Sequence, residues 1–175
     1  VQTCALPILA VMQTLRGVGV ENAGLKWPND ILVGQRKIAG VLLELVGDPA
    51  DVCHVVIGIG INVNMQAASE VDQLWTSVRL ETGVLSDRND LIARLNRTLE
   101  RYLSIHQQSG FSAFQAEWEQ GHLWQGRAVT LLAGASSVEG VVLGVDAQGA
   151  LRLKVGAEEK IFSGGELSLR LRDDS

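Results

Sequence analysis

A short hairpin between Leu25 and Leu45 constrains the fold of this chain more than any other stretch. Two runs inside it, Ile31–Val33 and Ile38–Leu45, are rich in branched apolar residues, which favour β-strands. Gly34 and Gln35 separate the runs, and glycine at the first central position suits a two-residue turn that needs a positive φ. The sequence therefore predicts an antiparallel pair of strands here.

Three charged residues accompany this apolar hairpin. A two-residue turn would place Leu32 opposite Lys37 and Asp30 opposite Ala39. Because side chains alternate along a strand, Lys26, Asp30 and Lys37 are expected to share one face. Two ammonium groups and a carboxylate are costly to desolvate. The residues alone leave two interpretations open, which are a solvated edge with a Lys–Asp ion pair and a binding site.

A second segment, Val52–Ile61, is predicted to form a further strand of the same antiparallel sheet. It contains Gly58 and Gly60, and glycines in a strand allow a ligand to approach the backbone closely. Asn62 follows, and its amide can both donate and accept, which suits the edge of a nucleobase. Val63 stands where a dinucleotide-binding G-x-G-x-x-G motif needs glycine, so that motif is excluded. The alternative is a buried strand with small residues for packing.

Apolar residues at helical spacing predict helices elsewhere in the first domain, and a turn is predicted at residues 47–51. Gly17, Gly83 and Gly110 are positioned to end three of the helices. These helices run over residues 9–16, from Ser69 to Gly83, from Ser86 or Asp87 to Gly110, and over Phe111, Phe114 and Trp118. The expected buried stripe of the longest helix is Leu91, Ile92, Leu95, Leu99, Tyr102 and Leu103.

The pattern changes near Gln125, where short β-like runs alternate with glycine-containing turns. The predicted strands cover residues 128–132, 138–145, 150–155, 160–162 and 167–171, with a turn at 146–149. Short strands at this spacing predict a small barrel that forms a second domain.

The charge balance argues against a general nucleic-acid-binding role for this chain. The chain carries 15 basic and 20 acidic residues, for a net charge of −5, whereas binding to phosphates needs a basic surface. No apolar run reaches the ~18 residues of a membrane span and no secretory leader is visible, so we expect a cytoplasmic globular protein. Cys4 and Cys53 lack a metal or redox spacing, and His54, His106 and His122 lack a ligand pattern, so we predict ordinary surface or core roles and no metal site.

The order of residues in both strand segments resembles the biotin protein ligases. Trp-Pro-Asn-Asp directly after Lys26, followed by Lys37–Gly40, is similar to that family's signature. Gly58–Asn62 is similar to its Gly-x-Gly-Ile-Asn strand, and Gly164–Arg170 is similar to the Gly-Gly-Glu-x-x-x-Arg of its C-terminal domain. The resemblance implies an α+β fold. Residues 1–124 would be part of a catalytic domain of the class II aminoacyl-tRNA-synthetase-like type, an antiparallel sheet with helices, and residues 125–175 a small SH3-like β-barrel.

The resemblance also implies a two-step reaction. The family joins the biotin carboxylate to the α-phosphate of ATP, giving biotinyl-5′-AMP, and then transfers biotin to a lysine of a biotin carboxyl carrier domain. Both steps concentrate negative charge, so fixed cations are the expected catalytic device. By resemblance, Lys37 contacts the biotin carboxyl and phosphate oxygens, Lys26 supports the phosphates, and Asp30 orients Lys37 or helps to place Mg²⁺. The other implied contacts are to biotin from Gly40, Leu42, Gly58 and Gly60, and to ATP from Asn29, Asn62 and Arg170.

Family elements that this sequence lacks set further expectations. The arginine–glycine loop that closes over biotin, Gly-Arg-Gly-Arg-x-Gly, does not occur in the 175 residues. The chain starts without methionine, and residues 1–8 read like a translated sequencing adapter. We therefore expect an N-terminally truncated fragment that is inactive by itself and whose residues 1–8 are not native.

Alternatives stay open for the parent protein. It would act mainly as a biotin-responsive repressor if a helix-turn-helix for DNA lay upstream. Lipoate ligases share the catalytic fold, but the Trp-Pro-Asn-Asp signature and the C-terminal barrel favour biotin. The sequence does not fix the oligomeric state, and a homodimer is among the partners considered.

Overall fold

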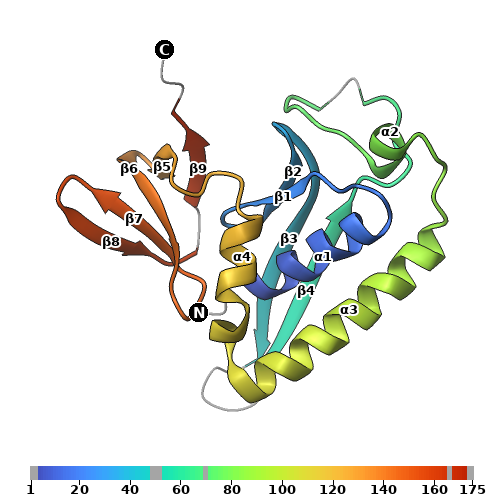
Figure 1. Ribbon diagram of the computed structural model, residues 1–175, viewed down its shortest axis with the longest axis horizontal. Coiled ribbons are helices and arrows are strands. Elements are labelled where there is room, and N and C mark those ends of the chain that lie inside the picture. The colour runs from blue at the N-terminus through green and yellow to red at the C-terminus, as the bar shows by residue number, and fades with distance from the viewer. Residues whose placement is uncertain (1–3, 48–52, 69–70, 165–166, 173–175) are drawn as a thin grey trace.

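The computed structural model describes residues 4–47, 53–68, 71–164 and 167–172. These residues form two antiparallel sheets, and all the helices belong to the first domain, which gives the predicted α+β class (Figure 1). The first sheet has the order β1-β2-β3-β4, with β1 at Ala23–Lys26, β2 at Asp30–Val33, β3 at Arg36–Gly47 and β4 at Cys53–Ile61. The helices are α1 at Ala5–Gly17, α2 at Val78–Thr82, α3 at Arg88–Ser109, the 3-10 helix η1 at Phe111–Phe114 and α4 at Gln115–Gly121. None of the helices in the described part is both long enough and apolar enough to cross a membrane.

Helix α1 lies at the centre of the first domain. It packs against β1, β2 and β3 on one side and against α3 and α4 on the others, as Figure 1 shows. Leu9, Met12 and Leu15 are fully buried, because contacts on several sides favour apolar residues all round a helix. The helix begins four residues earlier than predicted, and residues 5–8 form its buried first turn. Their non-native origin remains a prediction.

Helix α3 has the predicted ends but a narrower apolar face. The Asp87 side chain accepts a hydrogen bond from Asn89 N at 2.8 Å, and the helix stops at Gly110, whose φ is +67°. Within the predicted stripe, Ile92 and Leu103 are 53% and 44% exposed, so their burial was wrongly predicted. Helix α3 lies on the outside of the domain and packs mainly on α1 (Figure 1), so only a narrow stripe is covered. The buried residues of this stripe are Leu91, Leu95 and Tyr102.

The prediction of a helix from Ser69 to Gly83 was largely wrong. Ser69 lies outside the described residues, and residues 71–77 are not helical. The reason is a tertiary pairing, because Lys37 N donates to Leu74 O and Thr76 N donates to Lys37 O, each at 2.9 Å. Backbone groups that bond to β3 cannot also close helical turns. Only α2 forms, and it ends as predicted at Gly83.

The second sheet contains the five predicted strands, with ends shifted by at most two residues. Its order is β8-β7-β6-β5-β9. The strands are β5 at Ala128–Ala133, β6 at Ser136–Val145, β7 at Leu151–Val155, β8 at Glu158–Phe162 and β9 at Leu167–Leu171. The predicted turn is present, because Gly149 N donates to Asp146 O at 3.0 Å. The turn predicted at 47–51 lies outside the described residues except for Gly47.

Candidate functional site

The β2–β3 hairpin has the predicted two-residue turn but only part of the predicted register. Leu32 lies opposite Lys37, as predicted. Asp30 lies opposite Gly40, so the prediction of Ala39 as its partner was wrong. A β-bulge next to Leu32 shifts the ladder by one residue, and such an irregularity re-aims the side chains on one side of it.

The three predicted charged residues meet in one cluster. Asp30 Oδ1 lies 2.5 Å from Lys37 Nζ, and Asp30 Oδ2 lies 3.3 Å from Lys26 Nζ. The side chains of Lys26 and Asp30 are 15% and 16% exposed, whereas that of Lys37 is 31% exposed. One carboxylate therefore holds two ammonium groups, and the cluster keeps a net positive charge. Lys37 is the member with the most access to solvent.

A hollow of about 420 Å³ opens beside Lys37. Its floor comes from the middle of β3 and the end of β4, where Gly40 and Gly60 are direct partners. Neither residue places a side chain over the sheet, so a ligand can lie against the backbone. The lining residues are Lys37, Ile38, Ala39, Gly40, Gly60, Ile61, Asn62, Met65, Val71, Gln73 and Trp75.

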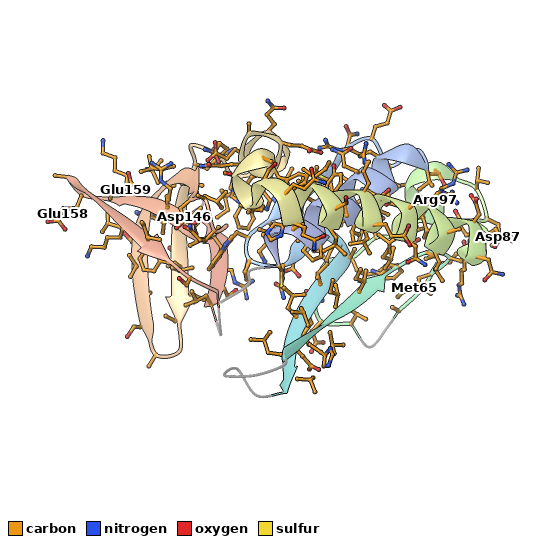
Figure 2. All side chains as sticks on the ribbon, turned by 90° about the horizontal axis from the view of Figure 1, so that it is seen from below. Met65, Asp87, Arg97, Asp146, Glu158 and Glu159 are labelled. Atoms are coloured by element: carbon orange, nitrogen blue, oxygen red, sulfur yellow. The ribbon has the colours of Figure 1, made fainter. Side chains whose placement is uncertain are left out.

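The wall of the hollow was missed by sequence reasoning. Met65, Val71, Gln73 and Trp75 come from the segment after β4, and a helix was predicted over the last three of them. Trp75 forms an isolated parallel bridge with Lys37, which brings this segment alongside β3. Figure 2 shows Met65 beside the first sheet, well away from Asp146 in the turn after β6 of the second sheet. The hollow therefore joins fixed positive charge to apolar and aromatic surface within the first domain.

Comparison with known proteins agrees with this arrangement. Residues 3–62 match the model of the Biotin/lipoate A/B protein ligase family, and residues 125–170 match the Biotin protein ligase C terminal domain. The chain belongs to the biotin protein ligase family.

Individual relatives support the family over nearly the whole chain. The bifunctional ligase/repressor BirA of Escherichia coli is 38% identical over 164 residues, which are 93% of this chain and 51% of that protein. The biotin--[acetyl-CoA-carboxylase] ligase of Mycobacterium tuberculosis is 37% identical, over 93% of this chain and 59% of that protein. The biotin protein ligase of Aquifex aeolicus in complex with biotin and ATP superposes with a TM-score of 0.84, at 29% identity, over 96% of this chain and 72% of that one. The chain thus spans 51–59% of the length of these two sequence relatives.

The biotin protein ligase fold places only some of the predicted biotin contacts at the hollow. Gly40 and Gly60 line it, but Leu42 and Gly58 pair with each other farther along the ladder and do not. The Leu42 side chain is 57% exposed. Leu42 and Gly58 could therefore contact only a ligand that extends past the hollow along β3 and β4.

Asn62 is at the hollow, and its predicted contact with ATP remains a prediction. Its Nδ2 donates to Thr76 O at 3.0 Å and to Lys37 O at 3.4 Å, and Ile38 O accepts from its backbone N. The amide nitrogen is thus engaged with the protein. In this arrangement the Asn62 amide nitrogen fixes the wall segment to β3.

The remaining predicted ATP contacts lie outside the hollow. Asn29 is in the loop between β1 and β2, where its carbonyl accepts from Val41 N at 2.9 Å. Arg170 is exposed on β9, opposite Thr130 in the second sheet. Within the described part of the chain, no hydrogen bond or ion pair joins Arg170 to the charged cluster. Its predicted reach to the nucleotide remains a prediction.

Mg²⁺ does not fit Asp30 in this biotin protein ligase chain. Both carboxylate oxygens already contact lysine ammonium groups, which would repel a divalent cation. Among the residues described, no group of three or more His, Cys, Asp and Glu side chains could hold a metal ion. The structure thus favours the first of the two predicted roles of Asp30, the orientation of Lys37.

The strand that carries Lys26 is fixed by aromatic residues from later in the chain. Trp27 is 1% exposed, its indole Nε1 donates to Gly149 O at 3.4 Å, and its backbone N donates to His122 Nε2 at 3.4 Å. His122 is stacked on Trp118 and buried, which agrees with the predicted core role, and burial lowers its pKa to about 4. Its ring is therefore neutral near pH 7, as an acceptor from Trp27 must be.

Proposed function

We propose that the protein to which this chain belongs attaches biotin to a lysine of a biotin carboxyl carrier protein, with ATP, through biotinyl-5′-AMP. The observation that carries this proposal is the position of Lys37. Its ammonium is held 2.5 Å from Asp30 at the edge of a hollow with a glycine floor. Relatives named as biotin ligases, and an Aquifex aeolicus relative solved with biotin and ATP, support the same function.

The charge cluster suits the first step. The biotin carboxylate attacks the α-phosphorus of ATP, a C–O–P bond forms, and pyrophosphate leaves. Negative charge grows on the α-phosphate oxygens, and a fixed ammonium stabilises it most strongly in a site that needs no reorganisation. Asp30 restrains Lys37 and Lys26, so two cations with one counter-ion face the reacting groups.

The same cluster suits the second step. A carrier lysine, as the free amine, attacks the biotinyl carbonyl, an amide forms, and AMP leaves with the bonding electron pair. The leaving phosphate again carries negative charge close to the cations. Lys37 and Lys26 therefore stabilise both the attack on phosphorus and the departure of AMP.

The hollow offers distinct surfaces to the two ring systems. The exposed backbone at Gly40 and Gly60 suits the flat, hydrogen-bonding ureido ring of biotin, whereas Trp75 and Val71 suit the faces of a purine. The volume of about 420 Å³ is within the range of small-molecule sites, roughly 300–1,000 Å³. Mg²⁺ enters in this proposal as part of the MgATP substrate, held by the phosphates rather than by a protein cage. We place the reaction in the cytoplasm, where the carrier protein and ATP meet.

A second function of the parent is favoured by one observation. The Escherichia coli relative is named a bifunctional ligase/repressor, and it is 38% identical to this chain. The 175 residues have a net charge of −5, which does not favour DNA binding by this part. A repressor role would therefore depend on residues outside this sequence.

The 175-residue chain by itself is proposed to be a poor catalyst. Its 175 residues contain no Gly-Arg-Gly-Arg-x-Gly run. Arg36 does not replace that run, because it stands outside any glycine-rich basic segment and forms an ion pair with Glu81 at 3.0 Å. A loop that closes over the adenylate excludes water and completes the phosphate contacts. Incubation of this chain with biotin, ATP and a carrier domain should give little transfer, and turnover at the rate of the intact parent would overturn this expectation.

The main test uses the intact parent. Labelled biotin, ATP, Mg²⁺ and a carrier domain should give a labelled carrier lysine, with pyrophosphate released in the first step. Labelled lipoate, supplied in parallel with its own acceptor domain, separates the two chemistries of this ligase family. Transfer of lipoate but not biotin would overturn the proposed function.

A further inference from the structure

The connector between the two domains, defined here as residues 122–127, lies along the strand that carries Lys26. Leu123 N donates to Leu25 O at 2.9 Å, and His122 forms a parallel bridge with Leu25. Gly24 faces the connector so closely that a Cβ there would overlap the Leu123 side chain. The connector is therefore packed on β1 and is not a free linker.

Trp124 of this connector lies next to the Lys26 ammonium. The Nζ atom is 5.7 Å from the centre of the indole ring, inside the range of a cation–π contact. On its other side the same Nζ lies 3.3 Å from Asp30 Oδ2. Lys26 is thus restrained twice, once by β2 and once by the connector, and its side chain is only 15% exposed.

The second sheet in turn holds the connector. Gln125 Nε2 donates to Leu143 O at 2.9 Å, and Gly126 N donates to Val142 O at 3.0 Å. The flanking helix α4, which lies between the two sheets in Figure 1, is bound as well, because Glu119 accepts from Val145 N at 3.1 Å. Trp124 therefore lies between Leu123, which is hydrogen-bonded to β1, and Gln125 and Gly126, which are hydrogen-bonded to β6.

We propose that Trp124 is a positioning residue that holds the Lys26 ammonium in the charged cluster, and that the second domain acts on the site through this ring. The inference rests on the proposed function for its catalytic consequence but not for the contact itself. Lysine ends in a point charge on a flexible four-carbon stem, so a second restraint narrows the positions that the charge occupies. Without the ring, Asp30 alone would hold Lys26 while also serving Lys37.

The contact can be tested in the 175-residue chain by NMR, without any reaction. An aromatic ring shifts nearby protons upfield, so the Lys26 ε-CH₂ protons should resonate upfield of those of Lys154, an exposed lysine on β7. Trp124→Leu should abolish this difference and Trp124→Phe should keep part of it. The control Phe162→Leu, which removes an aromatic ring from β8, should leave it unchanged. An unchanged Lys26 shift in a folded Trp124→Leu variant would overturn the proposal.

The catalytic consequence is tested in the intact parent. Trp124→Leu should slow adenylate formation about 2- to 30-fold, the range expected for loss of one cation–π contact. The KM for biotin should change little, and Trp124→Phe should recover most of the rate, which a general packing defect would not allow. An equal loss from Phe162→Leu, or no recovery with phenylalanine, would overturn the positioning role. If the unaltered parent forms no biotinyl adenylate, the proposed function is wrong, whereas the Trp124–Lys26 contact is still decided by the NMR shift.

Discussion

Asp30 and Gly40 are direct partners across the β2–β3 ladder, and the missing side chain of Gly40 leaves the room in which Lys37 reaches Asp30. A Cβ at position 40 would lie 3.2 Å from Lys37 Cε, 3.3 Å from Lys37 Nζ and 3.5 Å from Asp30 Oδ1. A side chain at position 40 would therefore crowd the Lys37 ammonium in its ion pair and cover part of the floor of the hollow.

Gly40→Ala should displace the Lys37 ammonium while leaving the fold intact. The end of a lysine side chain yields easily, so the free energy of unfolding should change by less than about 1 kcal/mol. Adenylate formation in the intact parent should slow about tenfold, the effect of roughly 1.4 kcal/mol in the transition state. Gly17→Ala is the matched control, because a Cβ there meets no atom of the described residues within 4 Å. A native rate for Gly40→Ala would contradict the prediction.

Lys37→Met should lower the rate of adenylate formation more than it weakens biotin binding. A charge aimed at the developing phosphate charge acts mostly in the transition state. Loss of one such group typically costs about 2.7–4 kcal/mol, or roughly a hundred- to a thousandfold in rate. Single-turnover adenylation and biotin titration in the intact parent provide the two measurements. Lys154→Met on the exposed side of β7 is the control. An unchanged rate for Lys37→Met would show that Lys37 is an ordinary surface lysine.

The stability of the chain should fall as His122 is forced to take up a proton. Burial lowers the pKa of His122 to about 4 from the ordinary 6.5, so the unfolded chain binds more protons between these two values. The contribution of the neutral His122 ring to the free energy of unfolding is complete above about pH 6.5 and is lost as the pH falls to about 4. At about 1.4 kcal/mol per pKa unit, the full loss is roughly 3 kcal/mol.

Urea unfolding at pH 7, 5.5 and 4.5 measures this loss directly. The variant His122→Asn should be less stable at pH 7 but should show a flatter decline with acid. His106→Asn on α3 serves as the control for removal of a histidine. An equal decline in the native chain and in His122→Asn would show that another group is responsible.

Gly144→Ala should weaken the attachment of the second sheet. Gly144 has a φ of +127°, and a Cβ there would overlap the Glu119 carboxylate, which accepts from Val145 N. Gly156→Ala serves as a control for a positive φ, with a φ of +62° and no atom of the described residues within 4 Å of the Cβ. It should cost about 1–2 kcal/mol for the backbone alone. Gly144→Ala should cost about 1–3 kcal/mol more, measured by chemical denaturation. Equal costs would mean that Glu119 moves aside without loss.

Features whose signals are local were predicted correctly from the amino-acid pattern. The β2–β3 turn, the ends of α3 at Asp87 and Gly110, and the strands of the second sheet were all predicted, because turn residues, caps and alternation act over a few neighbouring positions. The family was predicted as well, from Trp27–Asp30 with Lys37 and from Gly58–Asn62, and the two family matches confirm it. Lys26, Asp30 and Lys37 were predicted to share one face and do meet, although a bulge changes the register on which that prediction was based.

The wall of the hollow and the restraints on its lysines depend on contacts between distant parts of the chain. The apolar residues around Trp75 have helical spacing, so a helix was predicted there. However, Leu74 and Thr76 form backbone hydrogen bonds with Lys37, which lies more than 35 residues earlier in the chain. No local pattern encodes such a pairing. The bulge beside Asp30 and the donation of the Asn62 amide to Thr76 O depend on the same packing. Trp124 beside Lys26 is likewise a contact across 98 positions, fixed by hydrogen bonds between the connector and β6. The spacing of apolar residues predicts which face of a helix or strand is apolar. The segment that packs on that face depends on burial and hydrogen bonding in the folded chain.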